Sequence, residues 1–216
     1  MSGELRLAVL ISGSGSNLQA IIDAIETGEL RACIVTVVSN NPDAYGLQRA
    51  RAHGLATAVV DHRQYTGRDA YDEALARQLQ AIGPDIIVLA GFMRILGAGF
   101  VAGFSNRILN IHPSLLPAYK GLDTHRRALD NGESRHGVSI HLVTAELDDG
   151  PILAQGSYAI EPGDSVADLQ ARGHRLEHRM YPQVLRWLAD GKLIIESDGR
   201  ILYEQAPLDA PLRFDA

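Results

Sequence analysis

The chain has 216 residues, of which 46% are hydrophobic and 21% charged, a composition typical of a soluble globular protein with one domain. The net charge is −6 without a long lysine and arginine cluster, and no apolar run approaches the roughly 20 residues of a membrane span, so we predict neither a nucleic-acid nor a membrane partner. Cys33 is the only cysteine, which excludes a disulfide within the chain and fits a reducing, cytoplasmic location.

The first half of the chain alternates apolar segments with helical patterns. Strands are expected at 5–11, 34–38, 57–60 and 85–90, and helices at 18–25, 45–53 and 68–82. Strands that are apolar on both faces indicate a sheet covered by helices on both sides. We therefore predict an α/β fold with a doubly wound, mostly parallel sheet, in which ligands bind beyond the carboxyl ends of the strands.

The final third of the chain has a different pattern. Strands are expected at 138–144, 152–160, 193–196 and 201–203, and a long helix from a capping box at 164–168 to about residue 188. The turn cluster at 148–151 predicts an antiparallel hairpin between the first two of these strands, and the last two predict a small terminal hairpin. Because no internal repeat or low-complexity linker is found, residues 1–216 are predicted to form a single domain.

A glycine-rich loop, Gly-Ser-Gly-Ser-Asn at 13–17, joins the first predicted strand to the first predicted helix. Its backbone N–H groups and the positive helix end can bind an anion, and Ser16 and Asn17 add side-chain donors. Leu18 stands where a dinucleotide fingerprint has its third glycine, and the Gly-Lys of a P-loop is absent. We predict a phosphate site; the alternative is a plain strand-to-helix turn.

Asn110 and His112 lie two residues apart at the end of an apolar strand, and Pro113 follows. Alternate side chains of a strand point to the same face, so the amide and the imidazole should project together. Acyl transfer needs one group for the developing oxyanion and one for the proton, and this pair can supply both. The alternative is a strand end at which both residues only satisfy a turn.

Two other patterns are set aside. His174, Glu177 and His178 match the H-x-x-E-H form of a zinc protease, but the rest of the chain offers no clear third ligand, so we predict no metal. Ser114 is close to His112 but lacks the Gly-x-Ser-x-Gly elbow of a serine hydrolase.

Four segments carry a resemblance to a known family. They are LISGSGSNLQAI at 10–21, LAGFMRIL at 89–96, NIHPSLLP at 110–117 and DDGP at 148–151. With these motifs the chain closely resembles the phosphoribosylglycinamide formyltransferases, folate-dependent enzymes of purine synthesis, over about residues 5–190. The Asn-x-His and Ser-Leu-Leu-Pro signature is shared with other 10-formyltetrahydrofolate enzymes, whereas the glycine loop resembles this family in particular.

The resemblance implies the formyltransferase fold and a complete set of site residues. The enzyme would transfer the formyl group of 10-formyltetrahydrofolate, its co-substrate, to the amine of 5-phosphoribosylglycinamide in de novo purine biosynthesis. The implied roles are catalysis for Asn110, His112 and Asp148; ribonucleotide binding for Gly15, Ser16, Asn17 and Glu177; and folate binding for Arg68, Met93, Arg94, Ile95, Leu96 and again Asn110. The N-terminal half would bind the ribonucleotide, and the C-terminal half would bind folate and hold the catalytic groups.

The implied mechanism has no covalent enzyme intermediate. The amine attacks the formyl carbon directly, Asn110 binds the formyl oxygen, and protonated His112 helps to stabilise the oxyanion. Asp148 favours the charged imidazole, because an opposite charge nearby raises the pKa of a histidine.

Three positions depart from the family pattern, and two other functions stay open. Asp149 replaces a usual glycine, Asp123 a common histidine and His174 a common polar amide. One alternative is a 10-formyltetrahydrofolate hydrolase, although such proteins usually carry an additional N-terminal regulatory domain. The other is a non-catalytic nucleotide-binding regulatory module, which would not need all three catalytic groups. We expect small-molecule substrates as partners and a monomer or homodimer.

Overall fold

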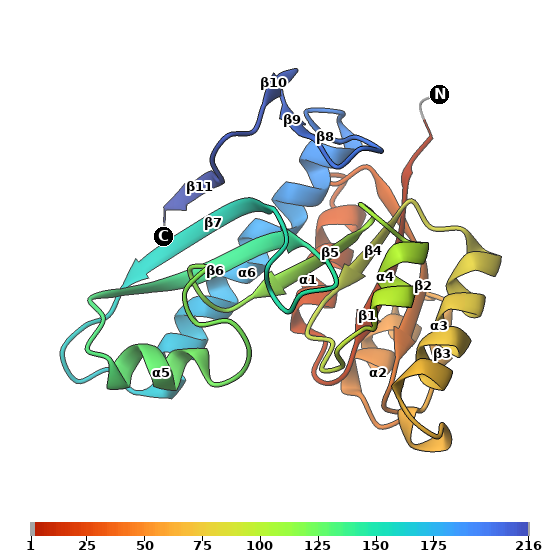
Figure 1. Ribbon diagram of the computed structural model, residues 1–216, viewed down its shortest axis with the longest axis horizontal. Helices are drawn as coiled ribbons and strands as arrows, with labels where there is room; N and C mark the ends of the chain where they lie inside the picture. The colour runs from red at the N-terminus through yellow and green to blue at the C-terminus, as the bar shows by residue number, and fades with distance from the viewer. Residues whose placement is uncertain (1–2, 216) are drawn as a thin grey trace.

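The computed structural model describes residues 3–215, and its main sheet has eight strands in the order β11-β7-β6-β5-β4-β1-β2-β3 (Figure 1). They are β1 (Leu5–Ile11), β2 (Ala32–Ser39), β3 (Thr57–Val59), β4 (Ile86–Leu89), β5 (Ile108–His112), β6 (Arg135–Leu142), β7 (Ile152–Ala159) and β11 (Leu212–Asp215). Strands β1 to β5 pair in parallel, whereas β6 is antiparallel to both β5 and β7. The predicted mostly parallel sheet with an antiparallel hairpin is confirmed.

Helices cover both faces of this sheet. They are α1 (Ser16–Glu26), α2 (Tyr45–Ala52), α3 (Arg68–Ile82), α4 (Ala98–Gly103), α5 (Thr124–Asp130) and α6 (Val166–Ala189), with a short 3-10 helix η1 (His62–Gln64). One hydrophobic core joins α1, α2 and α6 to one face, and a second joins α3 and α4 to the other. Strand β1 shows why there are two cores, because its alternate side chains point to opposite faces of the sheet. Val9 packs in the first core, whereas Ala8 and Leu10 pack in the second.

The C-terminal segment forms a small antiparallel sheet of β8 (Leu193–Ile195), β9 (Ile201–Tyr203) and β10 (Ala206–Pro207). The predicted terminal hairpin is thus confirmed. The sequence reading missed β10, β11, η1, α4 and α5, because elements this short show no periodicity. Strand β11 forms by parallel pairing with β7, and the two strands lie side by side in Figure 1.

The boundaries of the long helices follow from local chemistry. Helix α3 has the predicted bounds and ends at Gly83, which adopts the left-handed conformation. Helix α6 begins with the predicted capping box, in which Ser165 and Asp168 exchange side-chain and backbone hydrogen bonds. Over residues 3–215, no helix combines the length and apolar character needed to cross a bilayer.

Candidate active site

A cleft of about 950 Å3 opens where β1, β4 and β5 end. The glycine loop 12–17 follows β1, the segment 90–96 follows β4, and residues 110–113 end β5. Parallel strands bring these segments together because their carboxyl ends share one edge of the sheet. Residues 121–126, His141, residues 143–148 and part of α6 complete the lining. Every site residue predicted from the sequence lines this cleft except Arg68.

Asp148 lies next to both predicted catalytic side chains of β5. Its Oδ2 is 3.4 Å from His112 Nδ1, and its Oδ1 is at the end of a long 3.5 Å hydrogen bond from Asn110 Nδ2. The backbone N–H of Gly121 donates to Asp148 Oδ2 at 2.9 Å and holds the carboxylate in place. His112 is 6% exposed, and its Nε2 lies 2.9 Å from the backbone oxygen of Tyr119. Because a carbonyl oxygen only accepts, Nε2 carries a proton, and Nδ1 faces Asp148.

Burial decides the protonation state of this pair. It lowers the pKa of His112 below the ordinary value, and the raising effects of the Tyr119 carbonyl and of the Asp148 charge are too small to reverse this. Asp148 thus favours the charged imidazole as predicted, but the expectation that His112 is protonated before the reaction is wrong, because burial outweighs this charge. Burial would also raise the pKa of Asp148, but interactions with His141 and with the N–H of Gly121 hold it below its usual range. The free protein thus has a neutral imidazole beside a carboxylate.

His141 is a residue of this site that the sequence reading missed. It is buried on β6 and lies opposite Asn110 in the antiparallel register. Its Nδ1 donates to the backbone oxygen of Leu142, and its Nε2 is 3.1 Å from Asn110 Nδ2 and 3.6 Å from Asp148 Oδ1. The ring therefore orients the amide of Asn110. Only the pairing of β5 with β6 brings it there, so no local motif could have identified it.

The glycine loop folds tightly against the start of α2. Gly15 has φ of 70°, and a Cβ at this position would lie 2.6 Å from the Cα of Gly46. Ser16 begins α1, so its N–H lies at the positive end of the helix. Asn17 is buried, and its Nδ2 donates to Glu177 Oε2 of α6 at 2.7 Å. One amide hydrogen of Asn17 is therefore bound to Glu177, and the role of Asn17 in ribonucleotide binding stays a prediction.

Four of the predicted folate-binding residues, Met93 to Leu96, lie between β4 and α4. Met93 and Ile95 are 69% and 57% exposed on the cleft, whereas Leu96 is buried in the second core. The guanidinium of Arg94 lies 5.5 Å from the ring centroid of Tyr71 on α3. Large exposed apolar side chains beside a cleft are typical of a ligand-binding surface.

The structure places both patterns that were set aside from the sequence. The rings of His174 and His178 stack on successive turns of α6, with centroids 6.1 Å apart. Among residues 3–215, no group of three or more histidine, cysteine, aspartate or glutamate side chains could hold a metal ion. Ser114 donates to the backbone oxygen of Ala118 at 2.7 Å and does not pair with His112.

A family model described as formyl transferase matches residues 5–185. This chain belongs to the formyl transferase family. It is 50% identical to the phosphoribosylglycinamide formyltransferase of Escherichia coli strain K12 over 189 residues, which cover 88% of this chain and 89% of that relative. It also resembles the solved phosphoribosylglycinamide formyltransferase of Coxiella burnetii, with 46% identity, a TM-score of 0.92 and coverage of 98% of this chain and 99% of that one.

A second solved structure, glycinamide ribonucleotide transformylase 1 from Symbiobacterium toebii, is 46% identical with a TM-score of 0.87 and covers 93% of this chain and 94% of that one. The resemblance inferred from four short motifs is therefore confirmed over nearly the whole chain. The formyltransferase fold predicted from that resemblance is confirmed as well.

The three departures from the formyl transferase pattern lie around the cleft without displacing the catalytic groups. Lys120 Nζ forms an ion pair with Asp149 Oδ1 at 2.5 Å. This ion pair links the loop that carries Asp148 to the loop that carries Gly121. Asp123 and His174 line the cleft.

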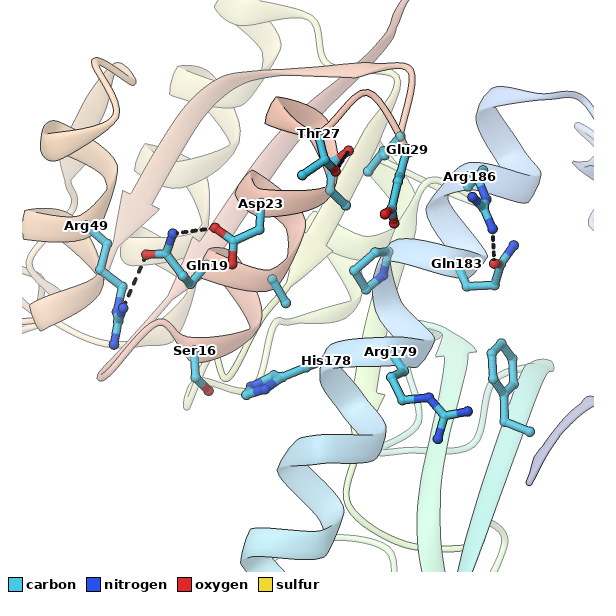
Figure 2. Close-up of a pocket in the computed structure, with 15 residues that line it drawn as sticks. Ser16, Gln19, Asp23, Thr27, Glu29, Arg49, His178, Arg179, Gln183 and Arg186 are labelled. Carbon is cyan, nitrogen blue, oxygen red and sulfur yellow. Dashed lines mark hydrogen bonds between the residues drawn. The ribbon is translucent and has the colours of Figure 1, made fainter. Parts of the chain in front are cut away.

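A second cavity, of about 710 Å3, lies between α1 and α6 and shares only Ser16 with the first (Figure 2). Several of its polar groups bind one another: Gln19 connects Asp23 to Arg49, and Arg186 donates to Gln183. None of the catalytic groups expected in a formyl transferase lies there. The first cleft is therefore the candidate active site.

Proposed function

We propose that this protein transfers the formyl group of 10-formyltetrahydrofolate to the amine of 5-phosphoribosylglycinamide, a step of de novo purine biosynthesis. The observation that carries the proposal is the meeting of Asn110, His112 and Asp148 in one cleft with the glycine loop. The two relatives named phosphoribosylglycinamide formyltransferase, which this chain matches over nearly their whole length, support the same reaction. The cytoplasmic location and the monomeric or homodimeric state remain predictions.

Each substrate has a matching part of the cleft in this proposal. The phosphate binds the N–H groups of Gly15 and Ser16, and Glu177 accepts hydrogen bonds from the ribose hydroxyls. The folate ring lies along Met93 to Leu96. Arg68 lies outside the cleft lining, so we assign it to the outer carboxylates of folate. A single domain with the ribonucleotide bound mainly by the N-terminal half and the catalytic groups in the C-terminal half remains our expectation.

The neutral state of His112 suggests the order of proton transfers. The amine attacks the formyl carbon, and His112 Nδ1 accepts the proton that the amine loses. The resulting imidazolium lies 3.4 Å from Asp148, whose charge stabilises it. Asn110 donates to the oxyanion of the tetrahedral intermediate. When the bond between the formyl carbon and the folate nitrogen breaks, His112 returns the proton to that nitrogen.

The rival function is hydrolysis of 10-formyltetrahydrofolate, with water in place of the amine. Release of tetrahydrofolate should be measured with and without 5-phosphoribosylglycinamide. We expect release to depend on the ribonucleotide, because the glycine loop and Glu177 would serve no purpose in a hydrolase. Equal rates with and without the ribonucleotide would overturn the proposed transfer and would show that the protein is a hydrolase.

The phosphate loop gives a selective prediction. Gly15→Ala should raise the KM for the ribonucleotide by about tenfold or more, because a Cβ both strains the left-handed backbone and displaces Gly46. The KM for folate should change less than about twofold. Gly28→Ala is the matched control, since Gly28 has φ of 77° at the other end of α1 with nothing within 4 Å of its Cβ position. A rise confined to the folate KM would show that the loop binds the other substrate.

A further inference from the structure

The segment 91–97 joins β4 to α4 without regular secondary structure. Two side chains from other elements bind its backbone. Ser12 Oγ accepts the N–H of Met93, and Asp72 Oδ2 of α3 accepts the N–H of Gly97, each at 2.7 Å. The shape of the segment therefore depends on one polar anchor in its middle and one at its end.

Asp72 is an unusual anchor, because its carboxylate is only 6% exposed. Its Oδ1 is buried and has no hydrogen-bond partner within residues 3–215. Burial raises its pKa, against the opposing effects of the Gly97 N–H and of the positive charges of Arg68 and Arg94. A buried carboxylate with one unpaired oxygen is unfavourable for stability. Its presence beneath a cleft-lining segment therefore indicates a role in the cleft.

Gly97 leaves the space that the Asp72 carboxylate occupies. A Cβ at this position would lie 2.9 Å from Asp72 Oδ2. The backbone of Gly97, with φ of −74° and ψ of 161°, is one that any residue can adopt. The close approach of Asp72, and not the backbone conformation, is thus what favours glycine here.

Arg68 and Arg94, the two cations near Asp72, are those assigned above to folate. Arg68 begins α3 one turn before Asp72, and Arg94 lies over the ring of Tyr71, the residue before Asp72. Within residues 3–215 neither guanidinium donates a hydrogen bond, and the Nε of Arg94 is buried without a partner. Asp72 thus attracts both cations while their N–H donors stay unused.

We propose that Asp72 is a positioning residue for the folate co-substrate. It holds the segment 91–97 through Gly97, and its charge attracts Arg68 and Arg94. The carboxylates of the folate tail then bind these two guanidinium groups, whose N–H donors are unused within residues 3–215, and Asp72 favours their position near the segment 91–97. This inference rests on the proposed function and names the residue that shapes its folate site.

The test compares Asp72→Asn with Asp69→Asn, which removes the same charge from an exposed position on the same helix. Asp72→Asn should weaken the binding of tetrahydrofolate, measured by calorimetry, by about tenfold, as expected for a hydrogen bond to a charged group. The KM for the ribonucleotide should stay within about twofold of the wild-type value. Asp69→Asn should change neither quantity by more than about twofold.

Gly97→Ala disturbs the same contact between Asp72 and Gly97 by changing Gly97. It should also weaken tetrahydrofolate binding. Combined with Asp72→Asn it should add little, because both variants break one interaction. Equal weakening of both substrates, or a lowered Tm with unchanged tetrahydrofolate binding, would show that Asp72 serves the fold alone. If wild-type protein failed to bind tetrahydrofolate, the proposed function itself would be wrong, and this assignment with it.

Discussion

Asp148→Asn should lower kcat by about a thousandfold or more while both substrates still bind. The amide has nearly the size of the carboxylate, so the shape of the loop at Gly121 should persist. It removes the negative charge 3.4 Å from His112 Nδ1 that stabilises the imidazolium formed as the amine loses its proton. The loss should appear in kcat, because that charge develops only during the reaction.

The same variant should also change the titration of His112. Asp148 raises the pKa of His112 against the larger lowering effect of burial. Removing the carboxylate should therefore lower this pKa still further below its ordinary value. Titration of the His112 ring by NMR in both proteins measures the change. An unchanged or higher pKa in the variant would mean that Asp148 acts only as a turn residue.

Asp149→Asn is the matched control for this experiment. Asp149 is the next residue, and it loses the same charge, but its carboxylate pairs with Lys120 at the surface. Exposed ion pairs contribute little, so kcat should stay within about threefold of wild type. A loss equal to that of Asp148→Asn would indicate a general effect of negative charge on this loop.

Asn110→Ala should lower kcat by about a hundredfold to a thousandfold, the usual result of removing one oxyanion donor. Asn110 Nδ2 is held by His141 at 3.1 Å, and its contact with Asp148 is long at 3.5 Å. The weaker contact leaves a hydrogen that can turn to the formyl oxygen as negative charge develops there. KM values for both substrates should change little, because this bond strengthens mainly in the transition state.

Single-turnover rates and calorimetric affinities of Asn110→Ala separate these effects. Asn131→Ala, on the short segment after α5, removes an equivalent amide that bonds the hydroxyl of Tyr119 away from the reacting centre. A loss for Asn110→Ala confined to binding would show that the amide positions folate and does not stabilise the oxyanion.

The architecture could be predicted from the sequence because its main elements are set by local chemistry. Strands such as 5–11 are apolar on both faces, which only a sheet covered on both sides can bury. Helix α3 was predicted with its observed bounds because Gly83 ends it. Asn110 and His112 can be predicted to project together because a strand places alternate residues on one face. Each of these features depends only on residues that are close together in the sequence.

The remaining features depend on contacts between distant segments. His141 reaches Asn110 only through the register of β5 and β6, and Asn17 meets Glu177 across 160 residues. The lowered pKa of His112 follows from burial, which no motif records, and burial outweighs the charge of Asp148. The sequence by itself therefore determined the family and the fold, and it predicts which groups react. Only the tertiary structure decided which groups support them and in which protonation state they begin, because desolvation and pairing arise when the chain is packed.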